Sequence, residues 1–161
     1  MLFRSMTAEA AIFLHRHKAA EDVVLGLPVA ARSDSARGIP GMVSNVVPLR
    51  VSVRPSVAAL EFIEQTGVQL RQVLTHRRYQ LADLRRDVGA NSDGGALFGL
   101  SINFMPFDYG FEFAGHRAIA RNLSLGPVED VSISVYERSD GNSLRIDFDG
   151  NSMLYAAEDL A

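Results

Sequence analysis

The sequence has 161 residues, 47% hydrophobic and 22% charged, a composition typical of one globular domain. Its net charge of −3 gives no basic excess for nucleic acid or an anionic membrane surface, and no apolar run is long enough to span a bilayer. Cysteine is absent, which excludes disulfides, cysteine metal ligands and a cysteine nucleophile, so we expect a reducing cytoplasm. The N-terminus does not resemble a signal peptide.

The first expected element is a helix with Thr7 as its N-cap, ending near Lys18 or Ala19. His15 and His17 lie near its C-terminus. Residues two apart on a helix point to different faces, so these histidines cannot chelate one metal ion together. Placing cations beside a helix C-terminus accounts for both, and we expect no metal site there.

Two apolar runs, residues 23–30 and 42–53, are joined by a polar loop. Val and Leu dominate both runs with little alternation, which predicts strands buried on both faces of a helix-covered sheet. Ser44 and Asn45 interrupt the second run. An unpaired buried amide costs about 1–3 kcal/mol, so these side chains need partners. They form either a bulge or satisfied core network, or a polar site on the sheet.

A second helix is expected to begin at Pro55-Ser56, with Ser56 as its N-cap. Its apolar residues recur at spacings of three and four, which is typical of an amphipathic helix lying on a sheet. Gly67 within this stripe is expected to permit close packing. The stripe consists of Leu60, Ile63, Gly67, Leu70 and Leu74.

A short helix is expected at residues 81–87, with an inner edge formed by Leu81, Leu84 and Val88. Around it lies a basic cluster, for which two interpretations stay open. It is either a solvated helix face beside acidic neighbours, or a docking surface for a phosphate or an acidic partner. The cluster consists of Arg77, Arg78, Arg85 and Arg86.

Beyond residue 97 the pattern changes to short strands, expected at 99–104, 111–113, 117–123, 128–136 and 144–148. Alternation of Val and Ile with Ser over 131–136 predicts one buried face. Asp140-Gly141 is the clearest hairpin turn, and residues 154–160 begin a closing helix. The order Asp147, Asp149, Asn151 lacks the twelve-residue loop and terminal Glu of a calcium site. Nucleophile-elbow, phosphate-loop, dinucleotide and H-x-x-x-H motifs are absent.

Four segments carry a resemblance to a known family: DVVLGLPVAAR (22–32), IPGMVSNVVPLRV (39–51), HRRYQLADLRRDVG (76–89) and FGLSINFMPFDYGFEF (98–113). In this order they resemble the second half of condensation domains of nonribosomal peptide synthetases. The resemblance implies an α/β fold, with a mixed, largely antiparallel β-sheet and helices packed on one face. Residues 1–161 would be a single domain similar to one chloramphenicol-acetyltransferase-like lobe, the C-terminal one.

The resemblance implies amide formation between a carrier-protein-bound acyl or peptidyl thioester and an aminoacyl acceptor. No cofactor would be bound directly, and the phosphopantetheine arms of the carrier proteins would be substrates. The hallmark HHxxxDG of the family belongs to the first lobe, and no adjacent histidines occur here. The partners implied are therefore the N-terminal lobe and peptidyl or aryl carrier proteins, and this chain would hold no catalytic residue of its own.

Carried over by residue, Asn45 matches the Asn of the Gly-x-x-x-Asn motif, and we expect it to face the substrate tunnel. Ser44 would point to the other side of a regular strand. Asn103 lies in a segment similar to a strand that borders the tunnel. His76 begins a His-Gln-x-Tyr-type motif in which Arg77 replaces Gln, and we expect His76 and Tyr79 to be structural.

Other readings stay open. A non-catalytic module of the same fold could dock carrier proteins or self-associate, and another acyltransferase of the superfamily could act on a soluble thioester. A single lobe exposes the surface that its partner would cover, so we expect a homo-oligomer of the isolated chain. The segments NFMPFDY (103–109) and NLSLGPVEDVSI (122–133) resemble modules of siderophore assembly.

Overall fold

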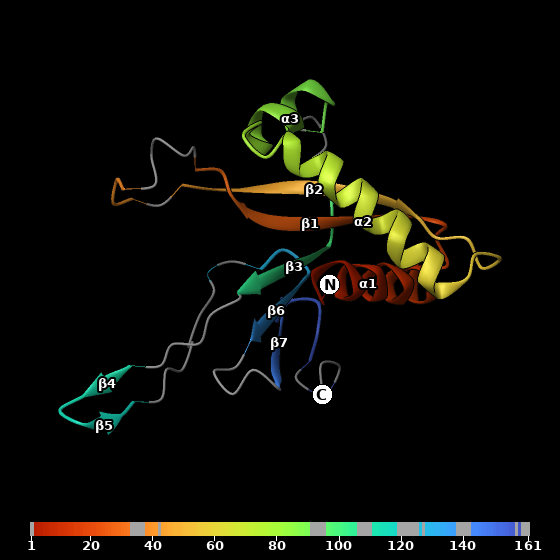
Figure 1. The fold of residues 1–161 in the computed structure, drawn as a ribbon. Helices are drawn as coiled ribbons and strands as arrows, with labels where there is room; N and C mark the ends of the chain where they lie inside the picture. Colours follow the sequence, from red (N-terminus) through yellow and green to blue (C-terminus); the bar gives the residue numbers. More distant parts are fainter. Residues whose placement is uncertain are drawn as a thin grey trace. The chain divides into compact units, whose positions relative to one another are not determined.

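The computed structural model describes residues 2–32, 38–41, 43–90, 96–105, 111–118, 126, 128–137, 143–156 and 158. Within them, five strands form one sheet in the order β2-β1-β3-β6-β7, and β4 and β5 form a separate ribbon (Figure 1). The chain divides into two compact units, Met1–Ile102 and Asn103–Ala161, with the boundary inside β3. The elements are α1 (Leu2–Lys18), β1 (Asp22–Ala30), β2 (Ser44–Ser52), α2 (Ala59–Thr75), α3 (Leu81–Asp87), β3 (Leu100–Met105), β4 (Glu112–Phe113), β5 (His116–Arg117), β6 (Val131–Glu137) and β7 (Leu144–Gly150).

The first unit is built on the antiparallel pair β1–β2, in which Leu25 lies opposite Leu49. On its other side β1 pairs in parallel with β3, through Leu25 and Leu100. Helix α1 contacts β1, α2 contacts β2, and the two helices contact each other. The core of this unit contains fully buried strand side chains such as Leu27 of β1 and Val51 of β2. The predicted mixed α/β sheet with packed helices is confirmed.

The prediction that both strands are buried on both faces is wrong for β2. Its buried residues alternate with exposed ones such as Arg50 and Ser52. The reason is that helix α2 contacts β2 and covers one of its faces, while the other face carries exposed or half-buried residues. The buried residues of β2 are Asn45, Val47, Leu49 and Val51.

Helix α1 begins at Leu2, so the prediction of Thr7 as its N-cap is wrong. Thr7 is fully buried inside the helix, and its Oγ1 donates a hydrogen bond of 2.8 Å to the carbonyl oxygen of Phe3. A threonine in a helix can satisfy its hydroxyl on the carbonyl four residues earlier, which removes the need for a capping position.

Helix α2 begins at Ala59, so Ser56 lies in the preceding turn and is not the N-cap. The expected stripe is shifted as well, because Leu60 is 79% exposed. The buried face consists instead of Phe62, Thr66, Gly67 and Leu70. Close packing at Gly67 is confirmed, since a Cβ added there would lie 3.1 Å from the Cδ atom of Arg4 in α1.

Helix α3 has the predicted bounds, but none of its residues is buried. Leu81 and Leu84 are half-buried, and Val88, expected at the inner edge, is exposed. Apolar burial therefore contributes little to holding α3 in place.

In the second unit β6 and β7 form the predicted antiparallel hairpin, which ends at the pair Glu137 and Leu144. Its predicted turn at Asp140-Gly141 lies outside the described residues. The expected single buried face of β6 is wrong, because Ser134 and Tyr136 are buried as well as Ile133 and Val135.

The β4–β5 ribbon turns through Ala114 and Gly115, both in the left-handed region with φ of 50° and 78°. The predicted turn at 113–115 is thereby confirmed. The strand expected at 117–123 is described only at its start, where β5 ends at Arg117. Of the closing helix expected at 154–160, residues 154–156 are described and form no helix, and residue 158 has a 3₁₀ conformation. Residues 157, 159 and 160 lie outside the described residues.

Candidate functional site

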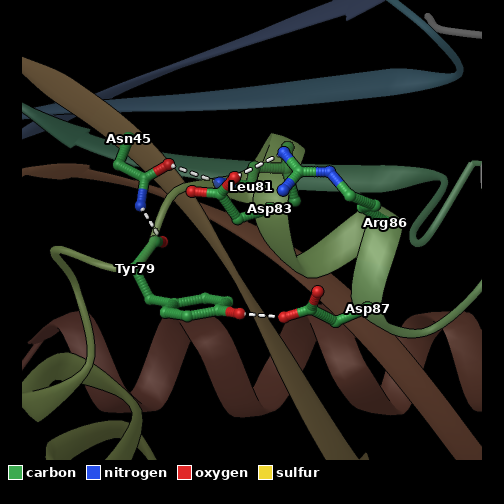
Figure 2. A network of polar contacts seen from close by, with 6 residues as sticks. All are labelled: Asn45, Tyr79, Leu81, Asp83, Arg86 and Asp87. Carbon is green, nitrogen blue, oxygen red and sulfur yellow. Dashed lines mark hydrogen bonds and ion pairs between the residues drawn. The ribbon is translucent and has the colours of Figure 1, made fainter.

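The amide of Asn45 connects β2 to the segment between α2 and α3. Its Nδ2 donates to the carbonyl oxygens of Arg77 (3.0 Å) and Tyr79 (2.6 Å), and its Oδ1 accepts a bond of 3.2 Å from the backbone N–H of Leu81. Figure 2 shows this side chain reaching the backbone at Tyr79 and at Leu81. With 7% exposure and three bonds, Asn45 forms a satisfied core network, one of the two interpretations left open by the sequence.

The need for these bonds arises from the way α3 begins. Leu81 opens the helix, where a backbone N–H has no partner within the helix. Gln80 occupies the N-cap position and makes no side-chain capping bond. Asn45 therefore caps α3 from a different element, a strand 36 residues earlier in the chain.

A second contact joins the turn before α3 to the C-terminal end of that helix. The Tyr79 hydroxyl donates a hydrogen bond to the carboxylate of Asp87 near the end of α3 (Figure 2). This bond, together with partial desolvation and the charges of Asp87 and Asp83, raises the pKa of Tyr79 above its ordinary value. Arg86 pairs with Asp83 across one turn of the helix at 2.6 Å.

The turn and α3 bring the four predicted basic residues into one segment. Arg77, Arg78 and Arg86 are exposed, and Arg85 is half-buried. The acidic side chains on α3 partly neutralise them, and the Arg77 guanidinium donates a 3.3 Å bond to the carbonyl of Leu74. Their role in docking a partner stays a prediction. We refer to residues 76–88 as the α3 segment.

The other predicted site residues lie elsewhere. Ser44 is exposed and pairs with Ala30, while Asn45 pairs with Val29, so the strand is regular and the two side chains point to opposite sides, as predicted. Asn103 is half-buried in β3 and belongs to the second unit. The tunnel-lining role of Ser44, Asn45 and Asn103 stays a prediction. His76 is exposed at the C-terminus of α2.

Sequence reasoning missed the role of Leu81, Tyr79 and Asp87 in this network. The pair Asp83 and Arg86 has the i,i+3 spacing that supports a helical ion pair, and it could have been found. No local pattern indicates which backbone groups a strand asparagine will reach.

Within the described residues, no cluster of three or more metal-ligating side chains occurs. The helices that the structure describes include none with the length and apolar character needed to cross a membrane.

Comparison with known proteins gives a consistent picture. The family model described as the condensation domain matches residues 4–161. The dimodular nonribosomal peptide synthase of Bacillus subtilis (strain 168) is 46% identical over 156 residues, which cover 96% of this chain and 7% of that protein. The isonitrile lipopeptide synthase of Streptomyces coeruleorubidus is 40% identical over 156 residues, 96% of this chain and 11% of that protein.

Among solved structures, a variant of the starter condensation domain of rhizomide synthetase RzmA, in complex with C8-CoA and Leu-SNAC, superposes with a TM-score of 0.89 at 42% identity. The match covers 99% of this chain and 36% of that one, so the chain spans only part of the proteins it matches. Because the family match extends over residues 4–161 and is supported at 46% identity, the chain belongs to the condensation domain family of nonribosomal peptide synthetases.

Proposed function

We propose that this chain forms the C-terminal lobe of a condensation domain that makes an amide bond between two carrier-bound substrates. The observation that carries the proposal is the family match over residues 4–161, joined to a fold similarity that covers about a third of a solved condensation domain. The donor is an acyl or peptidyl thioester and the acceptor an aminoacyl thioester. The proposal retains the cytoplasmic compartment predicted from the cysteine-free sequence.

In this reaction the acceptor amine attacks the thioester carbonyl of the donor. A C–N bond forms, the C–S bond breaks, and the amine proton ends on the released phosphopantetheine thiol. Holding both thioesters in one tunnel makes the encounter effectively intramolecular, which can contribute several kcal/mol. HHxxxDG is absent from this chain, so the histidine that positions the amine would come from the N-terminal lobe.

The chain would supply one wall of that tunnel. We assign Ser44 in the first unit and Asn103 in the second, each by itself, as a polar group that substrate can reach, because Ser44 is exposed and Asn103 is only half-buried. Asn45 has less to offer a substrate, since both amide hydrogens and one acceptor position are used by the backbone. What it retains is one acceptor position on Oδ1.

The basic residues of the α3 segment would face an acidic carrier protein. Three of the four arginines are exposed, which supports electrostatic attraction without a large burial cost. The phosphopantetheine arm of the carrier is a substrate in this proposal.

A second candidate is a non-catalytic module that docks carriers or self-associates. Exposed apolar side chains such as Phe113 and Phe148 favour this alternative. We expect the isolated chain to form homo-oligomers through such surface, which light scattering would detect; a monomer at high concentration would contradict this.

The decisive experiment uses the intact synthetase that contains this chain. A carrier loaded with an acyl donor and a carrier loaded with an aminoacyl acceptor are mixed with it, and mass spectrometry follows both arms. We expect the amide product on the acceptor carrier and a free thiol on the donor carrier. A donor arm that stays loaded in the presence of acceptor would favour the docking module.

A further inference from the structure

Polar contacts contribute much of what holds the α3 segment in place. No residue of α3 is fully buried, and its two leucines, Leu81 and Leu84, are only half-buried. Three of the hydrogen bonds that tie the segment to β2 converge on one side chain, the amide of Asn45. The contact of Tyr79 with Asp87 then connects the turn to the far end of α3.

We propose that Asn45 is a positioning residue for a carrier-protein docking surface, holding the turn and α3 so that their arginines are presented together to an acidic carrier. The inference rests on the proposed function, because it supposes that carriers dock here. It adds a role for a buried residue that would touch neither carrier nor reacting atoms.

The donor and acceptor groups of the amide explain why an amide side chain is needed at this position. Two carbonyls of the turn require donors and the N–H of Leu81 requires an acceptor, and a primary amide offers both on one planar group. Aspartate would retain the acceptor for Leu81 and lose both donors, placing its oxygen against two carbonyl oxygens. Alanine would lose all three bonds.

The charges of the segment identify its partner. Arg77 and Arg78 lie in the turn that Asn45 holds, and Arg86 lies in the last turn of α3, where it pairs with Asp83. A displaced turn would separate the first two from the third. An acidic partner would then meet three scattered cations instead of one surface, which lowers its affinity and the salt dependence of binding.

The test compares two acceptor substrates on the intact synthetase with Asn45→Ala. One acceptor is bound to its carrier protein, and the other is the same aminoacyl group on N-acetylcysteamine, which needs no carrier docking. We expect KM for the carrier-bound acceptor to rise about tenfold, and to rise more than KM for the soluble thioester, because only the carrier-bound form uses the docking surface. The same comparison with donor substrates shows which carrier is affected.

Two further measurements separate positioning from general stability. Hydrogen exchange should accelerate at residues 79–88 and stay unchanged in β1, because only the bonds to the α3 segment are lost. The KM of the variant should depend less on salt than that of the wild type. Ser52→Ala, an exposed substitution at the other end of β2, is the matched control and should change neither substrate's KM.

Several outcomes would overturn the inference. If kcat/KM falls equally for the carrier-bound and the soluble acceptor, Asn45 acts in the reaction itself. If KM is unchanged for both carriers, Asn45 has no role in docking. If Asn45→Ala and Asn45→Asp are both recovered unfolded, Asn45 serves the stability of the whole unit and not a local position. The proposed function fails separately, if the wild type makes no amide from either form of acceptor.

Discussion

The two edge strands of the sheet, β2 and β7, both carry apolar residues at alternate positions, but these residues are buried in one strand and exposed in the other. In β2 the alternate apolar residues Val47, Leu49 and Val51 are buried. In β7 the alternate apolar residues Leu144, Ile146 and Phe148 are exposed, Phe148 by 54%. Both strands have one partner strand, but helix α2 contacts β2.

Alternation therefore predicts which side chains share a face and leaves open whether that face is covered. Covering elements belong to distant parts of the chain, or to parts of a longer protein. The comparison predicts that equivalent substitutions in the two strands have unequal effects on the free energy of unfolding.

The largest effect is expected for Leu49→Ala in β2. Leu49 has no exposed surface, so the substitution removes buried methyl groups and leaves a cavity. We expect the free energy of unfolding to fall by about 2–5 kcal/mol, measured by urea denaturation. If the free energy of unfolding falls by only the amount expected for an exposed side chain, the residues around position 49 must repack and fill the cavity.

Gly26→Ala tests the opposite face of the neighbouring strand β1, where Gly26 pairs with Pro48. A Cβ at this position would clash with the Phe98 ring, which must then move. We expect destabilisation of about 1–3 kcal/mol. Phe98→Ala in the same chain should recover part of this loss, because it removes the atoms that clash. Additive effects in the double variant would contradict the close contact.

Phe148→Ala is the counterpart of Leu49→Ala in the exposed strand. About half of this side chain is already in contact with water, so we expect a loss of about 1 kcal/mol or less in the same urea experiment. A loss comparable to that of Leu49→Ala would show that self-association of the chain covers β7, and dilution would then reduce it.

The smallest effect concerns pH and the α3 segment. The neutral phenol of Tyr79 donates to Asp87, which raises its pKa, so the contribution of this bond is present below the ordinary pKa of tyrosine. It is lost as the pH rises through the raised value. In Asp87→Asn we expect Tyr79 to ionise at a lower pH by ultraviolet titration, with Tyr79→Phe identifying its signal. An unchanged titration would contradict the hydrogen bond.

The pattern of residues predicted strands in a helix-covered sheet, the bounds of α3, the close approach at Gly67 and the grouping of the arginines around α3. These features depend on residues that are close together in the chain. The mixed, largely antiparallel sheet followed from the resemblance to condensation domains. The family was also within reach, because four motifs stand in the order of a condensation domain.

Only the tertiary structure decided what Asn45 does, where α2 begins and which strand faces are buried. The amide of Asn45 bonds to backbone groups more than thirty residues away, and a backbone carbonyl carries no signal in the sequence. The expectations that Thr7 caps α1 and that Leu60 is buried came from local rules of capping and periodicity. In the fold, Thr7 is buried and bonds to the carbonyl of Phe3, and Leu60 is exposed, so packing decided both positions. Burial depends on which elements come together, and that is a property of the folded chain.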